Sequence, residues 1–272
     1  MGSGARLVPS LDLVHRVIAV DTAYTLARMR VLERIPGNPI GISYRRPDDV
    51  TALMARNLPS LAFNRVVGLR PGQAHHIEPL VNWYRQEGAA ASFEIAAGDH
   101  EPAIGQELAR LGFFQSAFHA ALIREPDVDI AVPHDIPVER VTTDQAMDAF
   151  LSAYVLGWGI PEHAREQFKR NVRPWIDEPG WSLYLARAEG RPAATAILYV
   201  RDGVGYLADA AADPAYRRRG LHVALLRRRI RDASAAGVEF VCSGAYHLST
   251  SHRNMERAGM RLLFLRAIWT QT

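Results

Sequence analysis

The residues best suited to chemistry lie in the segment 213–222, where a run of small residues leads through a basic turn into a helix-like pattern. The turn reads Arg217-Arg218-Arg219-Gly220-Leu221-His222. A turn of this kind at a helix N-terminus presents free backbone N–H groups and the positive end of the helix dipole to an anion. Phosphate is therefore the ligand that we expect. A basic surface turn that binds nothing would have the same composition, because one glycine among arginines is a weak pattern.

The pattern that follows the turn predicts an amphipathic helix. Apolar or small residues recur every three or four positions, at Val223, Leu226, Ile230, Ala233 and Gly237. The arginines of this segment lie largely off that stripe, at Arg227, Arg228, Arg229 and Arg231. We expect them to form a solvated face rather than a nucleic-acid surface, since no aromatic residues interleave with them.

The segments around the turn predict a mixed α/β domain. Before it we expect a strand at 138–141, a helix capped by Thr142 or Thr143, a helix over about 161–176, a hairpin of strands 181–186 and 193–200, and a strand at 205–212. After its helix we expect a strand at 238–242, a short helix ending at Gly259 and a strand at 260–270. Strands and helices in this order pack as a sheet with helices on its faces.

Residues from roughly 136 to 272 resemble the GNAT acetyltransferase superfamily on two motifs. The family's loop, Arg/Gln-x-x-Gly-x-Gly/Ala, is matched by 217–222 except at the last position, where His222 replaces a small residue. The segment 249–261 is similar to the family's short helix and closing Gly-Phe, with Met260 in place of Phe. Two motifs in the right order are far less frequent by chance than either alone.

The resemblance implies coenzyme A, as acetyl-CoA, for the cofactor. The loop N–H groups of Arg218 to His222 would hold the pyrophosphate, and the strand before the loop would pair with pantetheine. A backbone N–H at or near Ala210 would stabilise the thioester oxyanion. The residues that we assign to cofactor binding are Ala210, Ala211, Ala212, Arg217, Arg218, Arg219, Gly220, Leu221, His222 and Asn254.

The chemistry implied is direct attack of a substrate amine on the acetyl thioester in a ternary complex. An alkylamine has a pKa near ~10.4, so a base must remove a proton at neutral pH. Asp209, one residue before the alanine run, is the carboxylate best placed for this. The tyrosine that the family often uses as acid is replaced by Met255. Substitutes in the neighbouring loop are Tyr246, His247, Ser251 and His252, of which we select Tyr246 and Ser251 as catalytic candidates.

The N-terminal half predicts a degenerate copy of the same fold. A segment at 108–113 followed by apolar residues to 123 parallels 255–260 followed by apolar residues to 269. This half contains no arginine-glycine loop, so we expect it to bind no cofactor and to serve as a wall of the acceptor site or as a packing partner. We therefore expect a tandem GNAT-like α/β fold, with a central twisted mixed sheet flanked by helices in each half. The expected boundaries are 1–130 and 136–272, joined by a proline-rich linker.

Composition limits the other classes of protein. The chain of 272 residues has 48% hydrophobic residues and a formal charge of +3, as expected of a globular protein of two domains. Cys242 is its single cysteine, which excludes an intrachain disulfide and indicates a reducing compartment. Without a membrane-length apolar run or a signal-peptide core, we expect a cytoplasmic protein with no membrane partner. His75, His76 and Glu78 are neighbours in a turn without a second ligand cluster, so we expect no metal site.

Two functions remain open from the residues. The first is an acetyl-CoA-dependent N-acetyltransferase that acts on an amine of a small molecule or peptide. The second is a noncatalytic module that binds acyl-CoA or an anionic partner such as nucleic acid, and the missing tyrosine favours it. The paired motifs favour the enzyme, and nucleic acid is then not the expected partner. The acceptor amine, and whether the chain forms a homodimer, are not determined by the sequence.

Overall fold

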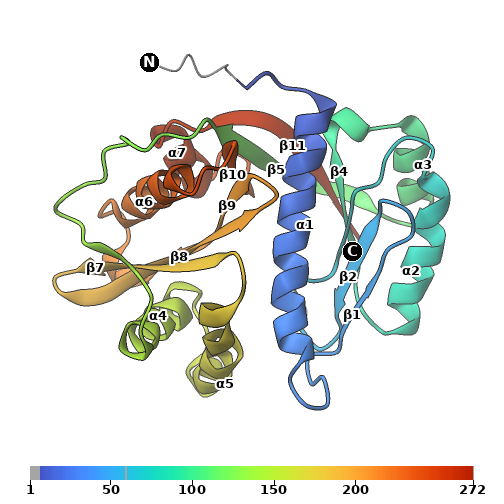
Figure 1. The fold of residues 1–272 in the computed structure, drawn as a ribbon. Helices are drawn as coiled ribbons and strands as arrows, with labels where there is room; N and C mark the ends of the chain where they lie inside the picture. Colours follow the sequence, from blue (N-terminus) through green and yellow to red (C-terminus); the bar gives the residue numbers. More distant parts are fainter. Residues whose placement is uncertain (1–6, 59, 272) are drawn as a thin grey trace. The chain divides into compact units, whose positions relative to one another are not determined.

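A computed structural model describes residues 7–58 and 60–271 of the chain. Its contacts divide the molecule into two compact units (Figure 1). The C-terminal unit consists mainly of residues 122–244 and 248–261, and the N-terminal unit of residues 9–121, 245–247 and 262–272. The boundaries expected at residues 130 and 136 stay a prediction. They divide the chain into two copies of one fold, whereas these units are defined by contacts alone. Within the described residues, no helix is both long and apolar enough to cross a bilayer.

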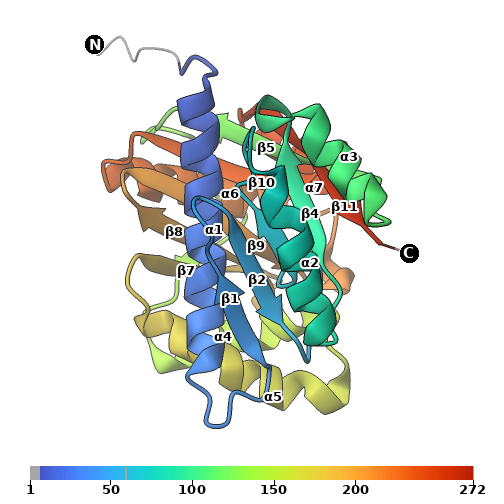
Figure 2. The ribbon, with the colours of Figure 1, turned by 90° about the vertical axis from the view of Figure 1, so that its right-hand side faces the viewer.

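The N-terminal unit is a sheet covered by helices on both faces. Its elements are α1 (Leu11–Glu33), β1 (Ile42–Arg45), β2 (Thr51–Ala55), β3 (Arg65–Val67), α2 (Ile77–Gln86), β4 (Ser92–Ala96), α3 (Pro102–Arg110) and most of β5 (Phe114–Arg124). Figure 2 shows α1 on one side of β1 and β2, with α2 and α3 on the other. Side chains of β2 alternate accordingly: Leu53 packs with Met29 of α1, and Met54 packs with Leu80 of α2.

The last strand of the chain belongs to this N-terminal unit. Strand β11 (Arg261–Thr270) runs antiparallel to β4, with Arg266 opposite Ala96 and Thr270 opposite Ser92. Arg266 is buried and pairs with Asp21 of α1 and with Glu94 of β4. Burial alone would raise the pKa of Glu94, but Arg65 and Arg266 outweigh it and lower this pKa to about 2. The C-terminal strand is thus fixed in the N-terminal unit by backbone pairing and by a buried ion cluster.

The C-terminal unit has the strand order β10-β9-β8-β7-β6. Its elements are β6 (Val138–Arg140), α4 (Asp144–Gly157), α5 (Glu162–Val172), β7 (Trp181–Ala188), β8 (Arg191–Arg201), β9 (Val204–Ala212), α6 (Leu221–Ala235), most of β10 (Phe240–Tyr246) and α7 (Thr250–Arg257). Helices α4 and α5 lie on one face of β7 and β8, and α6 lies on the other (Figure 1). The predicted mixed α/β fold is confirmed.

Strand β9 departs from regular pairing on both of its edges. Toward β8 the register shifts, so that Asp209 and Ala210 together oppose the single residue Ala196. Asp209 has a φ of 45°, a left-handed conformation that is uncommon for a residue other than glycine. Toward β10 the parallel pairing of the described residues ends at Tyr206, opposite Cys242. Beyond that point β9 has a β-bulge and an open edge, the two features that a ligand requires to pair with a strand.

Some elements have limits that the sequence did not reveal. Helix α1 begins at Leu11, where the Ser10 side chain caps it. The predicted helix 161–176 ends at Val172, because a 3₁₀ turn containing Pro174 follows it. Strand β2 was not predicted, since all five of its residues are buried and the sequence has no alternation to reveal it.

Candidate functional site

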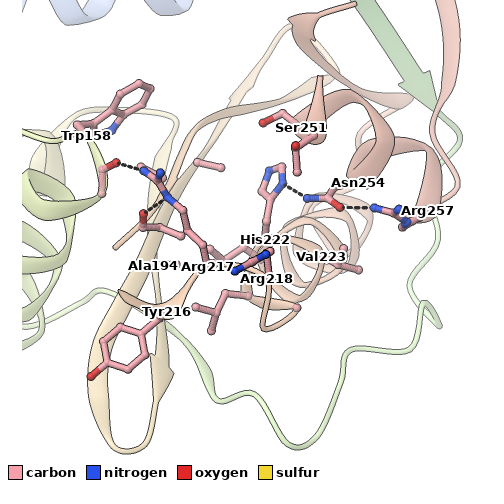
Figure 3. Close-up of a pocket in the computed structure, with 18 residues that line it drawn as sticks. Trp158, Ala194, Tyr216, Arg217, Arg218, His222, Val223, Ser251, Asn254 and Arg257 are labelled. Carbon is pink, nitrogen blue, oxygen red and sulfur yellow. Dashed lines mark hydrogen bonds between the residues drawn. The ribbon is translucent and has the colours of Figure 1, made fainter. Parts of the chain in front are cut away.

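One cavity of about 810 Å³ opens in the C-terminal unit between the end of β9 and the start of α6 (Figure 3). Segments that are far apart in the sequence line it: the end of α4, β8, β9, the basic turn, α6 and α7. The lining residues are Gly157, Trp158, Ala194, Ala210, Ala211, Ala212, Tyr216, Arg217, Arg218, Gly220, Leu221, His222, Val223, Leu225, Thr250, Ser251, Asn254 and Arg257.

The basic turn supplies backbone donors to this cavity. Gly220 is the N-cap residue of α6, with a φ of 79° that glycine adopts without strain. No side chain caps the first turn of α6, so the amides that most helices satisfy with a serine or aspartate have no such partner here. Arg218 also has a positive φ, 64°, which turns the chain sharply before the helix. A bent loop that ends in an uncapped helix N-terminus forms a concave set of N–H groups suited to a phosphate.

Positive charge surrounds these amides. Arg217, Arg218 and Arg257 line the cavity, and no lining residue is an Asp or Glu. Arg217 donates to the carbonyl oxygens of Ala212 (3.3 Å) and Gly157 (3.5 Å), which ties the turn to the end of β9 and to α4. Among the described residues, none of these three arginines forms a salt bridge with a carboxylate. Three arginines without acidic partners give the cavity a positive charge that favours the binding of an anion.

His222 stands in the first turn of α6, where the resembled motif has a small residue. Its Nδ1 accepts a hydrogen bond from the Asn254 side-chain amide (3.1 Å), and the Asn254 oxygen accepts from Arg257 (2.8 Å). Burial, and secondly the positive charge of Arg229, lower the pKa of His222 to about 4. The imidazole is therefore neutral at physiological pH. With Nδ1 as acceptor, its proton resides on Nε2, so His222 adds a neutral donor to the cavity.

Arg229 corrects the expectation of a solvated arginine face. Its side chain is fully buried, whereas Arg231 remains 43% exposed. Its Nη1 donates to the carbonyl oxygens of Ile197 (2.7 Å) and Ala208 (3.0 Å), and its Nε donates to Leu225 (3.1 Å). Ile197 and Ala208 are opposite each other at the edge of the β-bulge. The expectation was wrong because hydrogen bonds to strand carbonyls offset the cost of burying this charge. The periodicity of the helix does not show those carbonyls.

The structure brings most of the expected cofactor residues together. Ala210, Ala211, Ala212, Arg217, Arg218, Gly220, Leu221, His222 and Asn254 line the cavity, and so does the catalytic candidate Ser251. Arg219 does not line it, since its guanidinium pairs with Glu189 (2.6 Å) and lies over the Tyr216 ring. Their roles stay predictions, but the shared cavity is a fact of the fold.

The other two catalytic candidates lie elsewhere. Asp209 is in the β-bulge and is not among the residues that line the cavity. Tyr246 belongs to the N-terminal unit, is 55% exposed and packs edge-on against His119. Met255, at the position of the absent tyrosine, is buried on the inner face of α7.

Sequence reasoning did not find eight of the lining residues: Gly157, Trp158, Ala194, Tyr216, Val223, Leu225, Thr250 and Arg257. The available signal was the pair Gly157-Trp158 at the end of α4. A Cβ on Gly157 would lie 2.9 Å from the Cβ of Ala211, so α4 approaches β9 too closely for another side chain. Trp158 is 48% exposed beside this contact, and an exposed tryptophan next to an obligatory glycine is a reasonable marker of a site.

Comparison with protein families identifies the C-terminal half. Residues 131–248 match the model of the acetyltransferase (GNAT) domain. The matched residues run from just before β6 to just after β10 and include the basic turn. The family that this model describes transfers acyl groups from an acyl-CoA donor. Among curated proteins, none matches this sequence.

Solved structures extend the similarity to both halves of the chain. A GCN5-related N-acetyltransferase from Kribbella flavida is 17% identical, with a TM-score of 0.64 over 92% of this chain and 95% of its own. A tandem GNAT protein from the clavulanic acid biosynthesis pathway is 14% identical, with a TM-score of 0.60 over 94% and 92% of the two chains. A conserved protein of unknown function from Staphylococcus epidermidis is 12% identical, with a TM-score of 0.64 over 88% and 96%. The predicted tandem GNAT fold is confirmed.

Proposed function

We propose that this protein transfers the acetyl group of acetyl-CoA to an amine of a small molecule or a peptide. The observation that carries the proposal is the combination of an uncapped helix N-terminus with three arginines that lack acidic partners, all in one cavity. Coenzyme A has a pyrophosphate and a 3′-phosphate, whose negative charges complement the arginines and the backbone amides of this cavity.

The residues present fit the rest of coenzyme A. The backbone amides from Arg218 to His222 are our candidates to hold the pyrophosphate. Arg257, which lines the same cavity at the end of α7, is our candidate to bind a second phosphate group. The open edge of β9 at Ala210, Ala211 and Ala212 offers backbone groups to the amides of the pantetheine arm, and methyl side chains allow close approach.

The acyl-CoA supplies a thioester whose carbonyl gains negative charge when an amine attacks it. We assign its stabilisation to a backbone N–H in the β-bulge, at or near Ala210. Two residues of β9 face one residue of β8 there, which frees a backbone group from the ladder. Arg229 holds the carbonyls of Ile197 and Ala208 at the edge of this bulge from behind. It acts on the reaction by positioning and does not touch the cavity.

The amine must lose a proton before or during attack. We keep Asp209 as the base, because it is the carboxylate of the bulge itself, although it does not line the cavity. A tightening of geometry on substrate binding is common for such groups. The thiol of coenzyme A has a pKa of about 8.5, so it can leave as the thiolate without a general acid to protonate it. Ser251 is the hydroxyl of the cavity on the α7 side that can protonate it.

One observation favours a second candidate, a noncatalytic module that binds acyl-CoA. The buried Met255 removes a phenol from the position that the resembled family often uses. Such a module would bind acetyl-CoA as tightly as an enzyme does but would release no thiol.

The experiment that separates the two functions follows free thiol while the protein is incubated with acetyl-CoA and a broad panel of amines. Amine-dependent thiol release that is lost in Asp209→Asn supports the transferase. Tight binding of acetyl-CoA without thiol release for any amine supports the module. Absence of acetyl-CoA binding contradicts both.

A further inference from the structure

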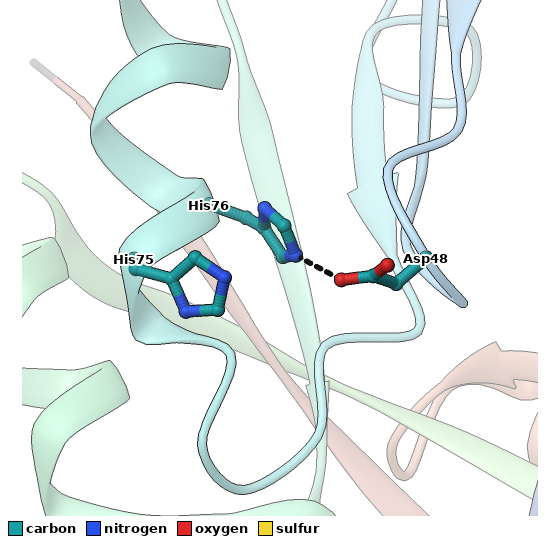
Figure 4. A group of neighbouring side chains, drawn as sticks. All are labelled: Asp48, His75 and His76. Atoms are coloured by element: carbon teal, nitrogen blue, oxygen red, sulfur yellow. Dashed lines mark hydrogen bonds and ion pairs between the residues drawn. The ribbon is translucent and has the colours of Figure 1, made fainter.

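Two histidines and an aspartate converge in the N-terminal unit, far along the chain from the cavity described above. His75 and His76 lie in a 3₁₀ turn (Ala74–His76) that leads directly into α2. Asp48 lies in the turn between β1 and β2. One ligand atom from each of the three residues lies within 4.8 Å of the others (Figure 4). The sequence predicted no metal site here because Asp48 is distant from the histidine pair in the chain.

The hydrogen bonds of the histidines favour metal ligation. Nδ1 of His75 donates to the carbonyl oxygen of Gly72 (3.1 Å), since a carbonyl can only accept. This bond fixes the tautomer and leaves Nε2 of His75 with its lone pair, as in metal-ligating histidines that donate their other N–H to a carbonyl. Nε2 of His76 and a carboxylate oxygen of Asp48 face each other at 2.7 Å. A proton lies between this nitrogen and this oxygen, and a cation bound to both atoms would replace it.

The surrounding loop is arranged for a cation and not for a phosphate. It runs from β3 into α2, as the basic turn runs from β9 into α6 in the other half. Its glycine amide is already occupied, because Gly72 N–H donates to a carboxylate oxygen of Glu101 (2.7 Å). The nearby cation Arg70 is paired with Asp49 (2.9 Å). Carboxylates thus occupy both the amide and the arginine of this loop, whereas the three arginines that line the cavity of the C-terminal unit have no carboxylate partner among the described residues.

We propose that Asp48, His75 and His76 bind a divalent transition-metal ion of the zinc class. Two imidazoles and one carboxylate are ligands that Zn²⁺ and Co²⁺ accept, and the exposure of Asp48 and His75 leaves room for water to complete the coordination. The ion links the β1–β2 turn to the start of α2. It therefore stabilises the N-terminal unit, and it takes no part in the proposed acyl transfer.

The test uses the full chain without a histidine tag, stripped with a chelator and dialysed. Titration with Zn²⁺ by calorimetry, and with Co²⁺ by visible absorption, should give one ion per chain, and saturating Zn²⁺ should raise the thermal midpoint. His76→Gln and Asp48→Asn should each weaken Zn²⁺ binding at least tenfold. Asp49→Asn is the matched control, because it removes a neighbouring charge outside the ligand set, and its affinity should stay within threefold.

Three results would overturn the proposal: no binding of Zn²⁺ or Co²⁺ up to millimolar concentration, unchanged affinity in both ligand variants, or an equal loss in Asp49→Asn. Circular dichroism and acetyl-CoA affinity of each variant serve as folding checks, since both should match the parent chain. Loss of zinc binding in a folded variant that still binds acetyl-CoA supports the site whether or not the protein proves to be a transferase.

Discussion

Replacement of Arg229 by methionine tests whether the β-bulge of β9 is the reacting part of the cavity. Arg229 is fully buried and donates to Ile197 and Ala208 on the two strands that the bulge joins. Methionine has a similar length and no donor, so the variant leaves both carbonyls without this partner while it keeps most of the packing.

The expected loss of stability is modest. Hydrogen bonds to a charged donor contribute about 1.5–3 kcal/mol each, so the loss of the three that Arg229 donates removes roughly 4.5–9 kcal/mol. The same substitution removes a buried charge, whose desolvation costs several kcal/mol. We therefore expect the free energy of unfolding of Arg229→Met to fall by only about 1–3 kcal/mol, measured by urea denaturation. The variant should be folded at 25 °C.

The expected loss of activity is larger than the loss of binding. Removal of one donor to the developing oxyanion typically costs 10²–10³ in kcat, and a displaced donor costs part of that. We expect kcat to fall about 10- to 100-fold in the thiol-release assay with an acceptor found in the amine panel. The Kd of acetyl-CoA from calorimetry should change less than threefold, because Arg229 does not line the cavity.

Arg231→Met is the matched control, since Arg231 lies on the same helix and is exposed. It should retain both kcat and Kd. A folded Arg229→Met variant with unchanged kcat would refute the positioning role. A Kd weakened as much as kcat is reduced would also refute it, since the arginine would then shape the whole cavity and not the bulge alone.

Three further predictions concern the cavity and the bulge of β9 beside it. Gly220→Glu should weaken acetyl-CoA binding at least about 30-fold by calorimetry, since it sets a carboxylate against the phosphates; Gly220→Ala imposes the same left-handed strain of about 1–2 kcal/mol without the charge and should lose far less affinity. Asp209→Asn should lower kcat/KM about 10²- to 10⁴-fold with little change in acetyl-CoA affinity, and a folded variant of full activity would exclude this base. The free energy of unfolding should fall as pH falls from 6.5 to 4, because the unfolded chain protonates His222 in a range where the folded chain does not. His222→Gln lacks this contribution of up to about 3 kcal/mol, so parallel pH profiles of variant and parent in urea denaturation would contradict the lowered pKa.

The basic turn could be predicted from the sequence because its chemistry is local. A glycine with positive φ, the absence of a capping side chain and the start of an apolar stripe all lie between residues 217 and 226. The three small residues before the turn were equally visible as a lining. The helices and strands of the C-terminal unit follow from periodicities of the same short range.

The burial of Arg229 and the lining by Trp158 and Arg257 could not be predicted, because they depend on segments that meet only in the fold. The helical periodicity shows that position 229 lies beside the apolar stripe, but it does not show which strand carbonyls accept hydrogen bonds from this side chain. The sequence likewise indicates that strand β11 ends the second half. In the structure it pairs with β4 of the N-terminal unit, which is far away in the chain, so no local pattern predicts this pairing.

The most direct test of the central claim is a calorimetric titration of the parent chain with acetyl-CoA. One basic turn with free amides predicts a single site per chain, and the occupied Gly72 amide in the N-terminal unit predicts no second one. Binding at a stoichiometry of one, weakened by added salt and lost in Gly220→Glu, is the result that we expect. No heat at saturating acetyl-CoA, or binding of equal strength in the folded Gly220→Glu variant, would contradict the assignment of this cavity to coenzyme A.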